Sequence, residues 1–228
     1  MLIDRQGNFF RGRLKIKSLL RIWPGLVLIL LPLCCTNSGQ RLQPLAPDAV
    51  ILAFGDSLTY GSGSAPDLEN DAALSYPARL QGLIDRTVIN AGVPGEMAIQ
   101  GASRLPGLLA RHKPALVILC HGGNDLLHAA SLATLASSLR RMINECRATG
   151  VDVVLVGVPR PHVFLAVPEL YEDLAEEFDL PLEREALVHI LGDNALKSDL
   201  VHPNAKGYEV LARAVAALLI RQGALPPS

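Results

Sequence analysis

Short apolar segments alternate with amphipathic segments along most of this chain, and this alternation constrains the fold more than any other feature. The short segments are apolar throughout rather than at every second position, as in strands buried on both faces of a sheet. Such strands, separated by helices, form a parallel sheet with a helical layer on each side. The sequence therefore predicts one three-layer α/β domain with five parallel strands. We expect strands at Val50–Phe54, Thr87–Asn90, Ala115–Cys120, Val151–Val158 and Leu187–Ile190, and helices at Tyr76–Ile84, Met97–Arg111 (with a kink or break at Pro106), Leu132–Arg147, Glu169–Phe178 and Ala205–Ile220.

The composition fits a single domain with appendages. Of the 228 residues, 50% are hydrophobic but only 4% are aromatic, which predicts a sizeable aliphatic core. The net charge of −1 conceals an asymmetry: residues 1–33 hold six Lys/Arg and one acidic residue, whereas the rest holds 15 Lys/Arg and 21 Asp/Glu, a net of −6. An acidic body without a basic stripe argues against nucleic acid as a partner.

The N-terminal segment has the organisation of an export signal. Five basic residues between Arg11 and Arg21 precede an uncharged apolar run, Ile22–Cys35. Two prolines interrupt this run of 14 residues, which is short of the ~20 residues that span a bilayer comfortably. We expect an export signal or a membrane or lipid anchor at residues 1–35, a linker at 36–48 and the folded domain at 49–228. The protein would then act outside the cytoplasm, in the periplasm or attached to the envelope of a bacterium.

The four cysteines fall into two groups with different expected roles. Cys34 and Cys35 end the apolar run, where bacterial lipoproteins carry their lipid-modified cysteine, although Leu33 is not the small residue that usually precedes it. A lipid anchor, a cleaved soluble form and an uncleaved membrane anchor all remain open. Cys120 and Cys146 are expected to be buried free thiols, and the sequence does not show whether they pair.

A polar turn directly follows the first predicted strand and carries a serine. Val50–Phe54 runs into Gly55, Asp56, Ser57 and Leu58. This turn would place the Ser57 hydroxyl at the carboxyl edge of the sheet, where open α/β sheets bind their ligands. Serine and aspartate are also ordinary turn and N-cap residues, so this segment alone does not separate a nucleophile from a structural turn.

Three further segments strengthen the interpretation of Ser57 as a nucleophile. The second strand runs into Asn90–Gly95 and the third into Gly122–Asp125, so these turns would lie beside Ser57 on one edge. Near the C-terminus Asp199 stands three residues before His202, and a carboxylate at this spacing can orient an imidazole ring and stabilise its protonated form. Each segment alone has an ordinary explanation as a turn or cap. Together they supply a hydroxyl, a paired imidazole and amide donors on one rim.

These four blocks resemble those of the SGNH/GDSL hydrolase family. The resemblance covers about residues 49–221 and implies a flavodoxin-like SGNH-hydrolase fold. Within the family the chain looks most similar to the bacterial thioesterase I, lysophospholipase and arylesterase group, because Ser75–Ala78 and Glu177–Leu182 also match.

The resemblance implies a role for each matched residue. Ser57 would be the nucleophile, His202 the general base and Asp199 the residue that orients His202. The backbone N–H groups of Ser57 and Gly95 and the side-chain amide of Asn124 would form the oxyanion hole. In the turn itself, Asp56 would be a structural hydrogen-bonding residue rather than a second acid.

Other polar residues receive lesser roles. His121 and His128 flank the third block, but their spacing is unlike that of compact zinc sites, so we expect rim or surface histidines and no metal or cofactor. The loop after the fourth strand is apolar and rich in proline. It could line an acyl pocket through Pro159, Val163 and Phe164, or it could be a surface loop that carries His162.

The sequence leads to a serine esterase that hydrolyses acyl esters or thioesters, including aryl esters and lysophospholipid-type substrates. Two alternatives remain. A carbohydrate O-deacetylase of the envelope could use the same triad, and a catalytically inactive module could bind lipid or glycan. The natural substrate, the acyl-chain length and the oligomeric state are left open.

Overall fold

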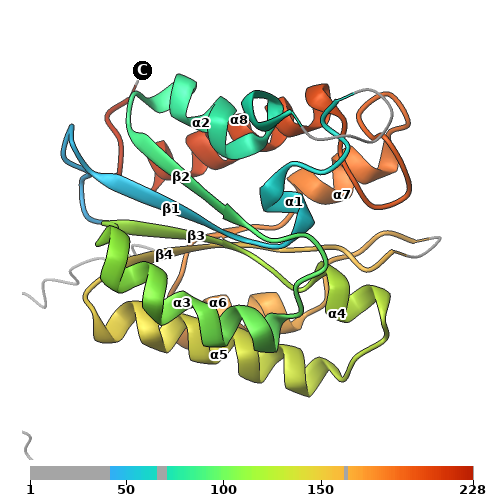
Figure 1. The fold of residues 1–228 in the computed structure, drawn as a ribbon, viewed down its shortest axis with the longest axis horizontal. Helices are drawn as coiled ribbons and strands as arrows, with labels where there is room; N and C mark the ends of the chain where they lie inside the picture. Colours follow the sequence, from blue (N-terminus) through green and yellow to red (C-terminus); the bar gives the residue numbers. More distant parts are fainter. Residues whose placement is uncertain (1–41, 66–70, 162–163, 228) are drawn as a thin grey trace, which may run out of the picture. The chain divides into compact units, whose positions relative to one another are not determined.

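The structure, a computed structural model, describes residues 42–65, 71–161 and 164–227. These residues form a five-stranded parallel sheet between two helical layers (Figure 1). The strand order is β2-β1-β3-β4-β5, which confirms the predicted three-layer α/β domain. The strands are β1 (Val50–Gly55), β2 (Thr87–Gly92), β3 (Leu116–Cys120), β4 (Asp152–Val156) and β5 (Leu182–Glu183).

Amphipathic helices cover both faces of the sheet (Figure 1). On one face α2 (Tyr76–Ile84) packs against α8 (Ala205–Arg221), and on the other α3 (Ala98–His112) packs against α5 (Leu132–Ala148). Helix α3 continues through Pro106 rather than breaking there. The remaining helices are α1 (Ser57–Tyr60), η2 (Ala72–Leu74), α4 (Gly123–Leu127), α6 (Leu170–Phe178) and α7 (Ala186–Gly192).

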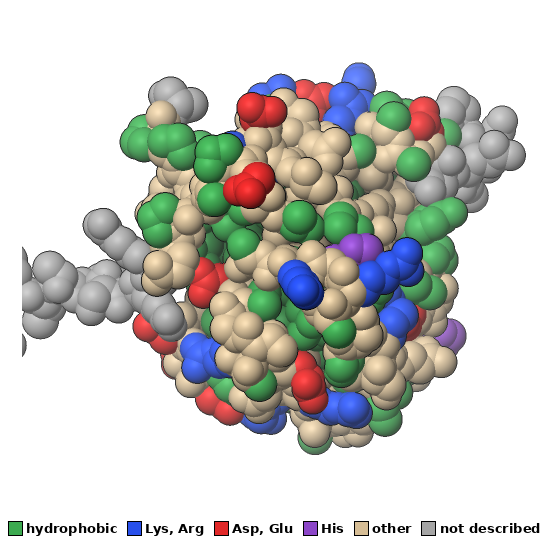
Figure 2. All heavy atoms as spheres, turned by 60° about the vertical axis from the view of Figure 1, so that its left-hand side comes forward, with side chains coloured by type: hydrophobic (Ala, Val, Ile, Leu, Met, Phe, Trp, Pro, Cys, Tyr) green, Lys and Arg blue, Asp and Glu red, His purple; other side chains and the backbone are tan. Residues whose placement is uncertain are grey.

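The core is mainly aliphatic, as the composition predicts. Every residue of β3 is buried, because helices cover this central strand on both sides. Fully buried tyrosines add bulk, and the Tyr171 hydroxyl donates to the His121 carbonyl at 2.8 Å. On the face turned forward in Figure 2, acidic and basic side chains are interspersed.

The fifth strand is not where the sequence placed it. Leu187–Ile190, predicted as a strand, lies in helix α7, and the edge strand is the two-residue segment β5. The buried residues of α7 follow a helical spacing, and the Glu183 side chain accepts a hydrogen bond from the N–H of Ala186 at 2.9 Å, where the helix begins. A short apolar run fits either element, so the apolar pattern alone could not distinguish this helix from a strand.

The folded domain begins earlier than residue 49. Leu42 is buried, and its N–H donates to the Gln222 carbonyl at 3.0 Å. Leu45 also packs against the core and its N–H donates to the Ala224 carbonyl at 2.8 Å, so this part of the predicted linker lies against the domain. Cys34 and Cys35 lie outside the described residues, whereas Cys120 and Cys146 are buried free thiols, as expected. Among the described residues, none of the helices has the length and hydropathy needed to cross a membrane.

The parallel topology brings the predicted functional segments to one edge of the sheet. Helices α1 and α4 follow directly on β1 and β3, and the segment after β2 leads into α3 at the same edge. In Figure 1, α1, α4 and α7 lie at the end toward which the strands point. This carboxyl edge is the place where ligands bind in open α/β sheets.

Candidate active site

Close packing at the end of β1 places Ser57 at the carboxyl edge. A Cβ atom at Gly55 would collide with the Cys120 carbonyl of the neighbouring strand, so glycine is required where β1 meets β3. Asp56 then caps the short helix α1, because its Oδ1 atom accepts the N–H of Leu58 at 3.1 Å. Ser57 is the first residue of this helix, two positions after the last residue of the strand.

Asp56 joins two of the strand ends. Its Oδ2 atom accepts the N–H of Gly123 at 3.0 Å, so one buried carboxyl group connects the start of α1 with the start of α4. Burial raises the pKa of this carboxyl group above its ordinary value, and the bonds from Leu58 and Gly123 oppose the rise. These contacts give Asp56 the structural role expected from the sequence.

The imidazole ring of His202 connects Ser57 with Asp199. Its Nε2 atom lies 3.0 Å from the Oγ atom of Ser57, and its Nδ1 atom lies 2.8 Å from the Oδ2 atom of Asp199. The other carboxylate oxygen, Oδ1, accepts the N–H groups of Val201 and His202, both at 2.7 Å. The Asp-x-x-His spacing therefore forms a tight turn whose carboxylate holds both its own backbone and the ring.

The surrounding contacts fix this turn and the charge of Asp199. The Ser198 N–H donates to the His202 carbonyl at 2.9 Å, and Asn204 caps helix α8 directly afterwards. Burial by itself would raise the pKa of Asp199, but the hydrogen bonds from His202 and from the N–H of Val201 lower it below its ordinary value. An ionised carboxylate thus faces the Nδ1 atom of the ring.

A pocket opens beside Ser57 and His202. Ser57, His202 and the buried Asn124 line it, so the structure brings the predicted nucleophile, base and amide donor together. The Nδ2 atom of Asn124 donates to the Glu96 carbonyl at 3.1 Å. The rest of the wall is largely apolar and includes Leu58, Leu127, Val158, Pro159, Pro161, Leu191 and Val201.

Gly95, the third predicted oxyanion residue, lies in the segment between β2 and α3. Its φ of +77° is in the left-handed region that favours glycine, and an added Cβ atom would meet no atom within 4 Å. Gly95 is not among the residues that line the pocket. Its neighbour Glu96 holds Asn124, so Gly95 lies next in sequence to a residue that contacts the site.

The residues predicted to bind substrate separate into three groups. Pro159 lines the pocket beside Ser57. Phe164 is 81% exposed and borders a different hollow, with Leu132 and Pro168. Val163 and His162 lie outside the described residues.

Leu127, Leu191 and Val201 also line the pocket. They were not singled out from the sequence, because single apolar residues in helices and turns carry no signal of a pocket.

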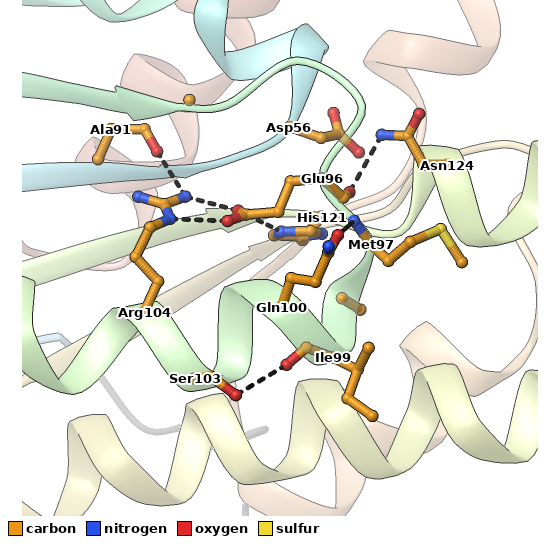
Figure 3. Close-up of polar contacts among 12 residues, drawn as sticks. Asp56, Ala91, Glu96, Met97, Ile99, Gln100, Ser103, Arg104, His121 and Asn124 are labelled. Atoms are coloured by element: carbon orange, nitrogen blue, oxygen red, sulfur yellow. Dashed lines mark hydrogen bonds and ion pairs between the residues drawn. The ribbon is translucent and has the colours of Figure 1, made fainter.

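The sequence analysis expected His121 to be a rim or surface histidine, and this expectation is wrong. Its side chain is fully buried, and its Nε2 atom lies 3.1 Å from the Oε2 atom of Glu96 (Figure 3). Arg104, two helical turns along α3, also binds this carboxylate. Glu96 and Arg104 were missed by the sequence analysis, because Glu96 lies in the loop before α3 and Arg104 lies inside the helix, and only packing brings them to His121. His128 is exposed, as expected.

Within the part of the chain that the structure describes, no three His, Cys, Asp or Glu residues form a group that could hold a metal ion. The polar groups at the pocket are those of acid–base and nucleophilic chemistry.

A hydroxyl, an imidazole and a carboxylate in one hydrogen-bonded chain, with an amide beside them, define the site of a serine hydrolase. The comparison with known families agrees with this class. The model of the GDSL-like lipase/acylhydrolase family matches residues 53–210, and the chain belongs to this family.

Relatives of this chain are named as hydrolases of the predicted group. Thioesterase 1/protease 1/lysophospholipase L1 of Escherichia coli (strain K12) is 30% identical over 173 residues, which are 71% of this chain and 79% of the relative. An arylesterase of Vibrio mimicus is 28% identical over 207 residues, or 86% and 98% of the two chains. The crystal structure of TesA superposes with a TM-score of 0.65 at 28% identity, covering 76% of this chain and 99% of TesA.

Proposed function

We propose that this protein is a serine esterase that forms an acyl-enzyme on Ser57 and acts on acyl esters or thioesters with an apolar acyl chain. The observation that carries the proposal is the continuous hydrogen-bonded path from Ser57 through His202 to Asp199. Membership of the acylhydrolase family and the thioesterase and arylesterase names of the relatives support it.

The geometry assigns a proton path for acylation. The ionised Asp199 accepts from Nδ1 of His202, so Nε2 is left as the acceptor that faces the Ser57 hydroxyl. As Oγ attacks the carbonyl carbon, its proton passes to Nε2, and the carbonyl π electrons move to the oxygen. When the tetrahedral intermediate collapses, the leaving alcohol or thiol takes this proton, and the acyl group stays on Ser57.

Deacylation uses the same groups in the same order. A water molecule gives a proton to His202 Nε2 and attacks the acyl carbon, and the proton then returns to Oγ as the carboxylic acid leaves. In both halves, negative charge develops on the former carbonyl oxygen. We assign its stabilisation to the Asn124 amide in the pocket wall and to the N–H groups of Ser57 and Gly95.

The apolar composition of the pocket wall is the feature that supports an apolar acyl group. Leu127, Leu191 and Val201 lie on the pocket with Ser57, and apolar walls of this kind gain binding free energy with each buried methylene group, about 0.8 kcal/mol. Leu127 is 47% exposed and Leu200, within the turn from Asp199 to His202, is 80% exposed, so apolar side chains also lie at the rim of the site.

A p-nitrophenyl ester series from C2 to C12 tests the proposal with the full chain and Ser57→Ala. We expect turnover by the wild type, a maximum at C6 or longer and at least about a 10³-fold loss in Ser57→Ala. A steep preference for acetyl would instead support an O-deacetylase. A folded wild type that hydrolyses none of the esters would overturn the esterase assignment and favour a binding module.

We further propose export and attachment to a bacterial envelope through the N-terminal segment, with Cys34 or Cys35 as the lipidated residue. The order of basic and apolar residues before Thr36 supports this proposal. Metabolic labelling with an alkyne fatty acid tests it in the wild type, in the single variants Cys34→Ala and Cys35→Ala, and in the double variant. Label that persists in both single variants and in the double variant would contradict lipidation at these cysteines.

A further inference from the structure

A second charged cluster lies beside the predicted oxyanion hole and has no part in the mechanism above (Figure 3). The carboxylate of Glu96, which is 7% exposed, accepts hydrogen bonds from Nε and Nη2 of Arg104 at 2.8 and 2.6 Å. Nη2 of Arg104 also donates to the Ala91 carbonyl at 3.0 Å, at the end of β2. The guanidinium carbon lies 4.3 Å from the centre of the Phe54 ring. Arg104 therefore binds the Glu96 carboxylate while its guanidinium group also contacts strands β1 and β2 of the sheet.

His121 holds the same carboxylate through its buried ring. The ring approaches Oε2 of Glu96 at 3.1 Å through Nε2, and the described residues offer its Nδ1 atom no hydrogen-bond partner. An ionised carboxylate can only accept, so Nε2 is the donor in this pair. The ring thus has Glu96 as its one described side-chain hydrogen-bond partner.

The backbone of Glu96 binds a residue that lines the catalytic pocket. Its carbonyl accepts one N–H of the Asn124 side-chain amide at 3.1 Å. The amide group is planar and carries two N–H bonds, so fixing one of them fixes the direction of the other. Asp125, the next residue, accepts the N–H of Ala98 at 2.9 Å and gives the two segments a second connection.

We propose that Glu96 is a positioning residue: Arg104 and His121 clamp its carboxylate so that its carbonyl sets the plane of the Asn124 amide for the developing oxyanion. This inference rests on the proposed function, in which Asn124 supplies an oxyanion donor. Glu96 itself does not line the pocket. Its expected influence is on the rate of the chemical step and not on substrate binding.

Two glycines of α3 offer a matched pair of probes for the cluster. A Cβ atom at Gly101 would lie 2.5 Å from Nε2 of His121 and 3.3 Å from Oε2 of Glu96, so an alanine there pushes into the bond between them. A Cβ atom at Gly107, on the same helix, would meet nothing within 4 Å. Alanine favours the helix at both positions, so the two substitutions differ chiefly in whether the added methyl group disturbs the cluster.

The experiment compares kcat and KM for p-nitrophenyl hexanoate in the full chain. Glu96→Gln and Gly101→Ala are each expected to lower kcat about 10-fold or more, a part of the 10²–10³ that one oxyanion donor supplies, with KM changed less than about 3-fold. The controls Gly107→Ala and Glu177→Gln are expected to stay within about 2-fold. Glu177 makes a similar ion pair with two nitrogens of Arg140, at 2.6–3.0 Å, but both side chains are exposed. Thermal unfolding by circular dichroism establishes that each variant is folded.

A double-mutant cycle separates positioning from a general structural effect. If Glu96 acts through Asn124, adding Glu96→Gln to Asn124→Ala lowers kcat by less than about 2-fold beyond Asn124→Ala alone. An equal fractional loss in both backgrounds, or an unchanged kcat in Glu96→Gln and Gly101→Ala, would overturn the proposal. Failure of the proposed function shows separately, as turnover that survives Ser57→Ala.

Discussion

The Nε2 atom of His202 lies 3.0 Å from the Oγ atom of Ser57, although 145 positions separate the two residues in the chain. The contact joins the turn after the first strand to the turn before the last helix. A carboxylate within each turn accepts hydrogen bonds from the turn's own backbone, Asp56 in the first turn and Asp199 in the second. The reacting pair is therefore placed by short local turns at the edge of a rigid sheet, which favours catalytic geometry.

Asp199→Asn is expected to lower kcat by about 10²–10⁴-fold while the protein stays folded. The N–H groups of Val201 and His202 both need an acceptor, so the one carbonyl oxygen of the new side-chain amide would face them. The amide NH₂ would then face Nδ1 of His202 and favour the tautomer that cannot accept the Ser57 proton. Stopped-flow hydrolysis of a p-nitrophenyl ester measures the loss. Wild-type kcat in this variant would contradict the role of Asp199.

Asn124→Ala is expected to lower kcat about 10²–10³-fold and to change KM little, because an oxyanion donor acts mainly in the transition state. Steady-state kinetics on one ester measure both constants. A rise in KM with constant kcat would instead make Asn124 a ground-state binding residue.

Leu127→Ser is expected to lower kcat/KM for a C8 ester by about 10-fold and for the C2 ester by less than about 2-fold. The leucine lines the pocket, and apolar contacts discriminate among chain lengths by roughly 1–3 kcal/mol. Leu83→Ser, on helix α2 with a similar exposure of 43%, is the matched control and should alter neither ester. An equal loss on both esters would remove Leu127 from the acyl site.

The buried carboxylate of Glu96 predicts a loss of stability in acid. Burial would raise its pKa, but the hydrogen bonds and charges of Arg104 and His121 lower it from 4.5 to about 2. A depressed pKa stabilises the folded state above the unfolded pKa, and this contribution disappears as the pH falls from about 4.5 to about 2. Its size is on the order of 3 kcal/mol at most.

Urea unfolding at several pH values between 2 and 6 tests this window. Glu96→Gln should be less stable than the wild type at pH 6, and its unfolding free energy should fall less steeply below pH 4.5. Asp199 also has a lowered pKa, but it contributes to both proteins and cancels in the comparison. Parallel curves for the two proteins would refute the assignment of this window to Glu96.

Much of the architecture was predictable because it depends on long, regular patterns. The apolar runs predicted β1 to β4 within a few residues, and the helical periodicity predicted α2, α3, α5, α6 and α8. β5 was missed because a two-residue edge strand has no period to detect. The helix α7 was missed because its apolar residues span only seven positions.

The candidate site divides in the same way. Ser57, Asp199 and His202 were predictable since each sits in a short block with its own local geometry, and the parallel topology brings the blocks together. The cluster of Glu96, Arg104 and His121 was not, because its three members come from a loop, a helix and a strand end, and only packing shows that they meet. For the same reason, His121 was assigned to the surface.

Covalent trapping of Ser57 tests the central claim most directly. The full chain is treated with a fluorophosphonate, and the modified residue is identified by peptide mass spectrometry, with Ser57→Ala and His202→Ala in parallel. The proposed mechanism predicts a single adduct on Ser57, none in Ser57→Ala and labelling slowed at least about 10²-fold in His202→Ala. A folded wild type that gains no adduct, or gains it on another residue, would contradict Ser57 as the nucleophile.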